Sequence, residues 1–291
     1  MNNFEEILLR LPLSIASELS TMPKEVIKHV EEIRLRCGQN PVITYGRQER
    51  RLSTTIKKED LQNILNSLIK YSYYAYEEDL AKGFVTIKGG HRVGICGKAV
   101  TSDNQPTLIK EISSMNIRFA KEFKGCANVL IPLIIKNDKP INTLIVSPPG
   151  CGKTTLLRDI ARILSIRGIT VGICDERSEI AGMYESFPSF DLGPRTDVID
   201  GCDKIYGIQM LIRTMSPQVI ITDEIGKERD IEAVEMCESA GVKVITSIHG
   251  ATKEELLKSK VKSLILNKTF QNIVYLSNNE GPGTIEEIEC V

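Results

Sequence analysis

The residues best suited to chemistry in this chain lie in one short loop, where a lysine stands between glycine and threonine. The loop follows an apolar run at 142–147 and opens an amphipathic helical pattern at 153–167. It matches the phosphate-binding pattern G-x-x-x-x-G-K-[ST] except at the first glycine, which is a serine here. Glycines let backbone N–H groups converge on phosphate oxygens, and a helix start adds free amides and a positive dipole. We therefore predict that ATP binds to Ser147, Pro148, Pro149, Gly150, Cys151, Gly152, Lys153, Thr154 and Thr155.

Within this loop, Lys153 is expected to neutralise the β- and γ-phosphates, and Thr154 to place its hydroxyl on Mg²⁺. A second chemical element is the pair Asp223 and Glu224, which ends the apolar run 218–224. The carboxyl ends of parallel strands face the ligand crevice, so Asp223 is predicted to hold Mg²⁺ through water and Glu224 to activate the attacking water. Two acids after a strand can also serve as helix caps. Because this chain also contains the lysine loop, the pair indicates ATP hydrolysis.

Two side chains of the loop are expected to be accessible before nucleotide binds. Cys151 lies between glycines, so its thiol should react with thiol-directed reagents, and Lys153 should face solvent. Nucleotide would then protect the thiol.

A third candidate is His249, which follows the apolar run 243–248 and precedes Gly250. We expect this run to form a strand inserted in space between the loop strand and the acidic strand. A histidine at its end could then act as a sensor that contacts the γ-phosphate, although a lone histidine is more often structural or simply exposed.

The elements that must position these residues alternate along the C-terminal half. Between the strands lie helical patterns at 153–167, 204–215 and 229–240. Strands joined by crossover helices form an open, mostly parallel sheet with helices on both faces. The prediction is an α/β fold, a RecA-like P-loop NTPase domain, with strands at 142–147, 169–174, 218–223, 243–248 and 272–277.

The N-terminal part is expected to be a smaller α+β domain, with domains at 1–125 and 126–291. Its predicted elements are strands within 31–45, a long helix at 59–82 and a hairpin at 83–100 around Gly89-Gly90. The tyrosine-rich segment 71–76 would lie on that helix, with Tyr71 and Tyr74 on one face. It is expected to pack in a core or between domains, or else to dock a partner.

Composition narrows the class of protein. The net charge is −1, with 42% hydrophobic and 26% charged residues, which is typical of a soluble globular chain. There is no basic excess for binding nucleic acid, and no apolar run of about 18 residues for direct membrane insertion. The eight cysteines form no CxxC pair, so we expect reduced thiols in a cytoplasmic protein.

Several segments resemble known families. ICDERSEI (173–180), MSPQVIITDEIGKERDIEA (215–233) and TSIHG (246–250) resemble the acidic box, Walker B segment and histidine box of the type II, type IV and pilus secretion ATPases. The whole chain, with GGHRVGICG (89–97) and SSMNIRFAKEFKGCANVLIP (113–132), is similar to a family of stage III sporulation proteins of endospore-forming bacteria.

The resemblance implies roles that the residues alone do not establish. Asp175, Glu176 and Glu179 fall on the acidic box, with Glu176 as a catalytic candidate, and His249 falls on the histidine box. Many secretion ATPases have glycine where this chain has Asp223, so its metal geometry is expected to be nearer that of ordinary ATPases. The family context implies a homo-oligomeric ring, such as a hexamer, in the mother-cell cytoplasm. Its partners would be membrane-embedded sporulation channel proteins encoded in the same operon.

Arginine fingers, often from a neighbouring subunit, stabilise charge on a transferring phosphate. Arg195 and Arg213 are the main catalytic candidates. Arg177 is a third, and each of these three could instead form a solvated ion pair. The resemblance to secretion ATPases implies that Arg92 and Arg118 of the N-terminal domain could close over the nucleotide.

Two other functions stay open at this stage. One is a RecA- or AAA-type ATPase that acts on nucleic acid, which the balanced charge disfavours. The other is an ATP-binding scaffold with little turnover, which the intact Asp223-Glu224 pair disfavours.

Overall fold

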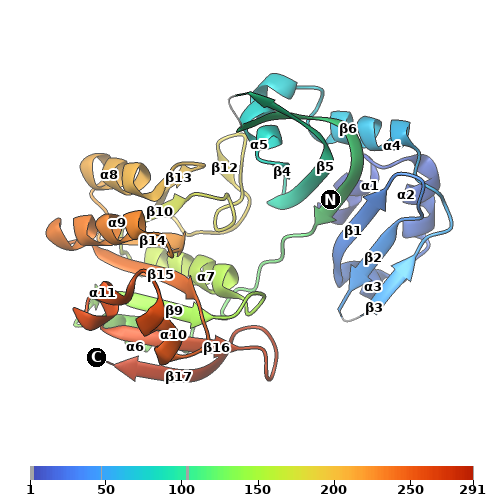
Figure 1. The fold of residues 1–291 in the computed structure, drawn as a ribbon. Helices are drawn as coiled ribbons and strands as arrows, with labels where there is room; N and C mark the ends of the chain where they lie inside the picture. Colours follow the sequence, from blue (N-terminus) through green and yellow to red (C-terminus); the bar gives the residue numbers. More distant parts are fainter. Residues whose placement is uncertain (1–2, 47, 103–104, 291) are drawn as a thin grey trace. The chain divides into compact units, whose positions relative to one another are not determined.

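The chain folds into two compact units. The computed structural model describes residues 3–46, 48–102 and 105–290, which Figure 1 shows as a ribbon. One unit contains the chain up to Ala120 together with Tyr184–Ser189, and the other contains Lys121–Met183 and Phe190–Val291. The contacts thus divide the chain slightly before residue 125, and they assign a short internal ribbon, β11 (Met183–Tyr184) with β12 (Phe187–Pro188), largely to the N-terminal unit.

The N-terminal unit is built on an antiparallel sheet in the order β3-β2-β1-β6-β5-β4. Gly89 and Gly90 both have positive φ, so they form the predicted tight turn between β4 and β5. Helix α4 buries Leu61, Ile64, Leu65 and Leu68 in this unit's core, on the face that the sequence predicts. The strands are β1 (Val30–Arg36), β2 (Val42–Tyr45), β3 (Gln48–Arg51), β4 (Phe84–Ile87), β5 (His91–Ser102) and β6 (Gln105–Arg118). The helices are α1 (Asn3–Leu8), α2 (Leu13–Ser20), α3 (Lys24–Lys28), α4 (Lys58–Leu68), η1 (Tyr73–Tyr76) and α5 (Glu77–Ala81).

The prediction of one long helix at 59–82 is wrong. Helix α4 ends at Leu68, and Lys70 and Tyr71 have φ values of 51° and 61°, a left-handed conformation that ends a right-handed helix. Tyr71 and Tyr74 therefore share no helical face. Their exposures of 73% and 91% exclude them from this unit's core.

The C-terminal unit contains a sheet of seven strands in the order β13-β10-β14-β15-β9-β16-β17. All neighbouring pairs are parallel except β16 with β17, which is antiparallel. The strands are β9 (Thr143–Ser147), β10 (Val171–Asp175), β13 (Thr196–Asp200), β14 (Val219–Glu224), β15 (Lys243–His249), β16 (Asn272–Ser277) and β17 (Thr284–Cys290).

Alternate residues of each central strand supply two hydrophobic cores, one on either face of this sheet. Ile145 and Ile245 pack in the core with α7 (Lys153–Ile166), whereas Leu144 and Val244 pack in the other core. That second core also holds residues of α8 (Lys204–Met215) and α9 (Glu228–Ser239). The smaller elements of the unit are α6 (Ile131–Ile134), β7 (Ile135–Lys136), β8 (Lys139–Pro140), α10 (Lys253–Lys258) and α11 (Lys262–Leu266).

The structure contains the five predicted strands and three predicted helices of this half, with small shifts at their ends. Strand β15 lies between β14 and β9, as predicted. The sequence did not reveal β13 or the antiparallel β17. No helix among the described residues has the length and apolar character needed to cross a bilayer.

Candidate nucleotide site

The lysine loop connects the buried strand β9 to helix α7, which begins at Lys153. Gly150 and Gly152 have φ values of 75° and 82°, a region that glycine enters without steric cost. Because α7 starts directly after Gly152, its first free amides point toward the loop. Local backbone geometry is therefore that of an anion-binding turn.

The ammonium of Lys153 turns back over this loop. Its Nζ donates to the carbonyl oxygens of Ser147 at 3.0 Å and Pro148 at 3.4 Å, and lies 3.7 Å from Oε2 of Glu224. The side chain is only 11% exposed, so the expectation that it faces solvent is wrong. Thr154 and Thr155 follow in the first turn of α7, each partly exposed.

The rear of the loop is closed by the turn between β16 and β17. The amide of Gly283 donates to the carbonyl of Cys151 at 3.0 Å, and a Cβ at Gly152 would come within 3.7 Å of Pro282. Cys151 is 3% exposed and packs in the core that contains α7. The expectation of an accessible thiol is therefore wrong, because the flanking glycines leave the backbone open while the side chain points inward.

The two acids at the end of β14 have different environments. Asp223 is 8% exposed, whereas the side chain of Glu224 is 46% exposed. The hydroxyl of Thr246, on the inserted strand β15, donates to the carbonyl of Asp223 at 2.7 Å. Asp223 is thus held in place, and Glu224 is free to face a ligand.

His249 ends strand β15 in an exposed position. It pairs in register with Ser147 of β9, and the amide of Gly250 donates to the Ser147 carbonyl at 3.2 Å. The inserted strand therefore places the histidine beside the start of the lysine loop, as the sensor hypothesis requires.

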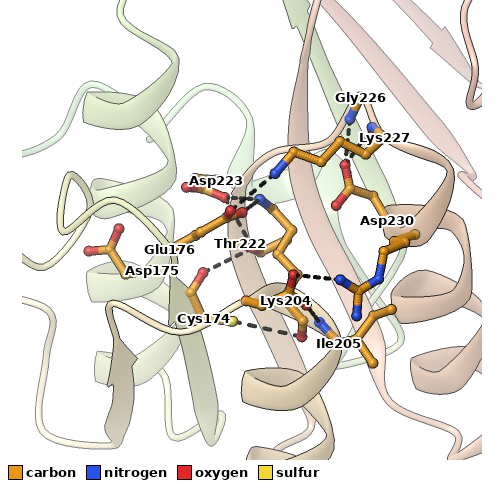
Figure 2. Close-up of polar contacts among 12 residues, drawn as sticks. Cys174, Asp175, Glu176, Lys204, Ile205, Thr222, Asp223, Gly226, Lys227 and Asp230 are labelled. Carbon is orange, nitrogen blue, oxygen red and sulfur yellow. Dashed lines mark hydrogen bonds and ion pairs between the residues drawn. The ribbon is translucent and has the colours of Figure 1, made fainter. Parts of the chain in front are cut away.

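The two adjacent acids at the end of β10, Asp175 and Glu176, have different surroundings. Asp175 is fully buried and accepts backbone hydrogen bonds from Glu179 at 2.9 Å, Ile180 at 3.0 Å and Ala181 at 2.8 Å. Burial raises the pKa of Asp175 to about 6 despite these bonds. Glu176, the next residue, is directed instead toward Asp223 through Lys204 (Figure 2).

Asp175→Asn is expected to destabilise the protein by about 2 kcal/mol at pH 8, because its amide group would face backbone donors that now have an acceptor. Urea denaturation of the full chain measures the change. Asp197→Asn on the neighbouring strand β13 is the control, and it should change stability by less than about 0.5 kcal/mol. Equal stability of the two variants would refute a structural role for Asp175.

Arg158 was not singled out by sequence, yet it joins α7 to this acidic segment. Its guanidinium donates to the carbonyls of Ile180 at 2.7 Å, Glu179 at 2.8 Å and Lys121 at 2.9 Å, and it stacks on Phe190. The helix that begins with Lys153 and the loop that carries Glu176 are therefore fixed to each other.

Lys204 was also missed, although it lies at the centre of the acidic cluster. It is 4% exposed, and its Nζ lies 2.7 Å from Oδ1 of Asp223 and 2.5 Å from Oε2 of Glu176 (Figure 2). These two carboxylates keep the pKa of Lys204 above its ordinary value although burial acts to lower it. A signal was present in the sequence: Lys204 is the first residue of a helix, where the positive end of the dipole disfavours a cation.

Arg195 and Arg213 do not lie among these residues. Arg195 immediately precedes β13, at the edge where the parallel strands begin, and its guanidinium donates to the carbonyl of Gly168 at 3.2 Å. Arg213 is in the last turn of α8, about 13 Å along the helix axis from Lys204. The nucleotide residues are at the opposite edge of the sheet, where the strands end.

The other arginine candidates have separate locations. Arg177 is exposed beside Glu176. Burial raises the pKa of Asp223, and the charge of Arg177 acts against that shift. Arg92 and Arg118 belong to the N-terminal unit, where Arg92 stacks on Phe84 and Arg118 lies 3.9 Å from Glu32.

The donor set suits a nucleotide with a hard divalent cation. The loop offers backbone amides and the Lys153 ammonium for phosphate, and Thr154 and Asp223 supply the oxygen atoms that Mg²⁺ prefers. A Cβ at Gly150 would meet no atom within 4 Å, so the loop is open on the side of this residue.

Comparison with solved structures identifies the fold class. The chain is similar to the ATPase DotB of Legionella pneumophila, with a TM-score of 0.55 and 16% identity over 84% of this chain and 71% of that one. It is similar to the pilus retraction motor PilT with bound ADP, with a TM-score of 0.56 and 16% identity over 86% and 75% of the two chains. The fold is therefore that of the P-loop secretion ATPases.

The sequence places the chain more narrowly: it belongs to the family "Sporulation stage III, protein AA", which matches residues 1–289. Stage III sporulation protein AA of Bacillus subtilis (strain 168) is 41% identical over 294 aligned residues, which cover 99% of this chain and 94% of that protein. The predicted resemblance to a sporulation family with the secretion-ATPase fold is confirmed.

Proposed function

We propose that this protein binds and hydrolyses ATP as a motor of the secretion-ATPase type. The observation that carries the proposal is the position of Lys153, whose ammonium rests on the phosphate-loop carbonyls and lies 3.7 Å from Oε2 of Glu224. The cationic loop and the exposed acid that follows the buried Asp223 thus meet at one edge of the sheet.

Each residue has a defined task in this proposal. The loop amides and Lys153 bind the phosphate chain, and Thr154 and Asp223 hold the metal shell. A Mg²⁺ ion held there would offset the negative charge that develops on the phosphate oxygens. Glu224 orients a water molecule and takes its proton, and His249 contacts the γ-phosphate from the inserted strand.

Arg195 and Arg213 could serve this chemistry only from a neighbouring subunit, since they lie at the other edge of their own sheet. The proposal therefore includes a homo-oligomeric ring, such as a hexamer, in which the N-terminal unit of each subunit transmits the nucleotide state to the partners. The partners would be membrane-embedded channel proteins encoded in the same operon, with the ATPase on the cytoplasmic, mother-cell side. Transport between mother cell and forespore would be the work performed.

The direct test is Mg²⁺-dependent phosphate release by the purified full-length chain, alone and with its reconstituted membrane partners. Turnover that partners stimulate is the expected result. Stimulation by DNA or RNA at physiological salt would instead favour a nucleic-acid ATPase. Tight ATP binding with no turnover under either condition would favour a scaffold.

His249→Ala is expected to leave ATP affinity within about threefold and to slow hydrolysis by about tenfold or more, because it removes a donor aimed at developing charge. His249→Gln keeps a donor and should retain more activity than the alanine variant. Steady-state turnover measures both. Unchanged turnover in His249→Ala, with and without partners, would make the histidine a bystander.

A further inference from the structure

The feature with an unassigned role is the bridge that Lys204 forms between the carboxylate of Asp223, in β14, and that of Glu176, in the turn after β10. Oδ1 of Asp223 and Oε2 of Glu176 both lie within 2.7 Å of the one Lys204 nitrogen. The lysine side chain is 5% exposed and that of Asp223 is 9% exposed, so solvent screens this contact little. The exposed Lys227 also forms an ion pair with Glu176, and its Nζ lies 3.2 Å from Oε1 of that residue.

The fold places Lys204 there through close backbone packing. Asp203 caps α8 by accepting the amide of Ile205 at 3.1 Å, which sets the first turn of the helix. Gly207, one turn later, lies so near strand β10 that a Cβ would stand 2.5 Å from Sγ of Cys174. A glycine at this point lets the start of α8 approach β10 closely. Figure 2 shows Lys204 reaching both acids from this helix start.

Two carboxylate oxygens that converge on one point are the kind of ligand pair a divalent cation binds. Here an ammonium group occupies that point as a fixed part of the chain. We propose that Lys204 is a resident counter-ion that prevents Asp223 and Glu176 from binding a divalent cation by themselves, so that metal enters only together with nucleotide phosphates. The inference rests on the proposed function in assigning Asp223 to the metal shell.

The physical reason is charge balance at a nearly dry position. With Lys204 present, a divalent cation would have to approach a positive charge or displace a buried ammonium from two short contacts, and both are costly. Nucleotide phosphates add negative charge and further oxygen ligands on the side of the lysine loop. Metal binding then no longer depends on the two acids alone.

The experiment is a titration of the nucleotide-free, full-length protein with Mn²⁺, in which electron paramagnetic resonance measures the concentration of the free ion. Lys204→Met keeps the length of the buried chain and removes its charge, and it should bind Mn²⁺ at least about tenfold more tightly than the unaltered protein. Lys227→Met removes the exposed lysine on the same glutamate and should change Mn²⁺ affinity by less than about threefold. Adding Glu176→Gln to Lys204→Met should abolish the gain.

Unchanged Mn²⁺ affinity in a folded Lys204→Met protein would overturn the inference. If that variant does not fold, the unaltered protein provides the test. Micromolar Mn²⁺ binding without nucleotide, lost in Glu176→Gln, would contradict the role given to Lys204. No micromolar Mn²⁺ binding to the unaltered protein would support that role. None of these measurements requires ATP. A failure to bind ATP would therefore refute the proposed function, and the Mn²⁺ titration would still test the role of Lys204.

Discussion

Replacing Lys153 with alanine is expected to weaken Mg-ATP binding by about a hundredfold or more, since the loop would lose its only cationic side chain. The fold should survive, because the contacts of the ammonium with the described residues are two to loop carbonyls and a longer one to Glu224. Equilibrium binding of a fluorescent ATP analogue measures the loss, and thermal melting without nucleotide checks the fold.

Arg167→Ala is the matched control, because it removes an exposed positive charge at the far end of the same helix. It should leave ATP affinity within about twofold. Affinity retained within a few-fold by Lys153→Ala would show that this loop is not the nucleotide site.

Glu224→Gln should stop hydrolysis while ATP binding persists. The amide keeps the size of the side chain but cannot accept the proton of the attacking water, which predicts a loss in kcat of about a hundredfold or more. Lys153 and Asp223 remain, so affinity for Mg-ATP should stay within about threefold. Single-turnover phosphate release and nucleotide-binding measurements on the same sample separate the two effects.

Glu228→Gln, an exposed acid in the first turn of α9, provides the control and should turn over ATP normally. If Glu224→Gln retains half of the normal rate, another group activates the water. Glu176, which Lys204 links to Asp223, is then the next candidate, and its bond to Lys204 would have to open.

The ATP-loaded Glu224→Gln protein also tests the ring. Arg195 or Arg213 can reach a γ-phosphate only from another subunit, so ATP should promote assembly that multi-angle light scattering detects. If the ATP-loaded variant stays monomeric over a wide concentration range, both arginine assignments must be withdrawn. Assembly would then require the membrane partners.

Sequence was sufficient to place Lys153, Asp223 and His249 near the carboxyl ends of parallel strands, while their chemical roles stay predictions. Each of the three follows an apolar run, and parallel strands bring their carboxyl ends to one edge. The insertion of β15 between β9 and β14 could be predicted because one apolar run, 169–174, separates the loop run from the acidic run along the chain, a pattern typical of one division of ATPases. Spacing could not reveal which of two adjacent acids would be buried, because Asp175 and Glu176 differ only in the direction that the strand end gives them.

Other features depended on packing that the sequence does not display. Lys204 reads as an ordinary helical lysine until Gly207 and Cys174 show how closely α8 approaches β10. Arg195 and Arg213 have suitable chemistry, but only the strand directions show that they lie at the far edge. In the N-terminal unit, the helical pattern continues through Lys70 and Tyr71, which adopt a left-handed backbone that non-glycine residues seldom enter.

The order of strands in the sheet has a consequence for how the protein folds during its synthesis on the ribosome. Strand β9, which carries the phosphate loop, pairs on one side with β15 and on the other with β16. Both neighbours are made long after β9, and the turn at Gly283 that supports Cys151 is made later still. Closing such sequence-distant contacts is slow, and a nascent chain cannot close them before their partners emerge. The N-terminal antiparallel sheet can form early, whereas competence to bind nucleotide arises only when the C-terminal strands have joined the sheet.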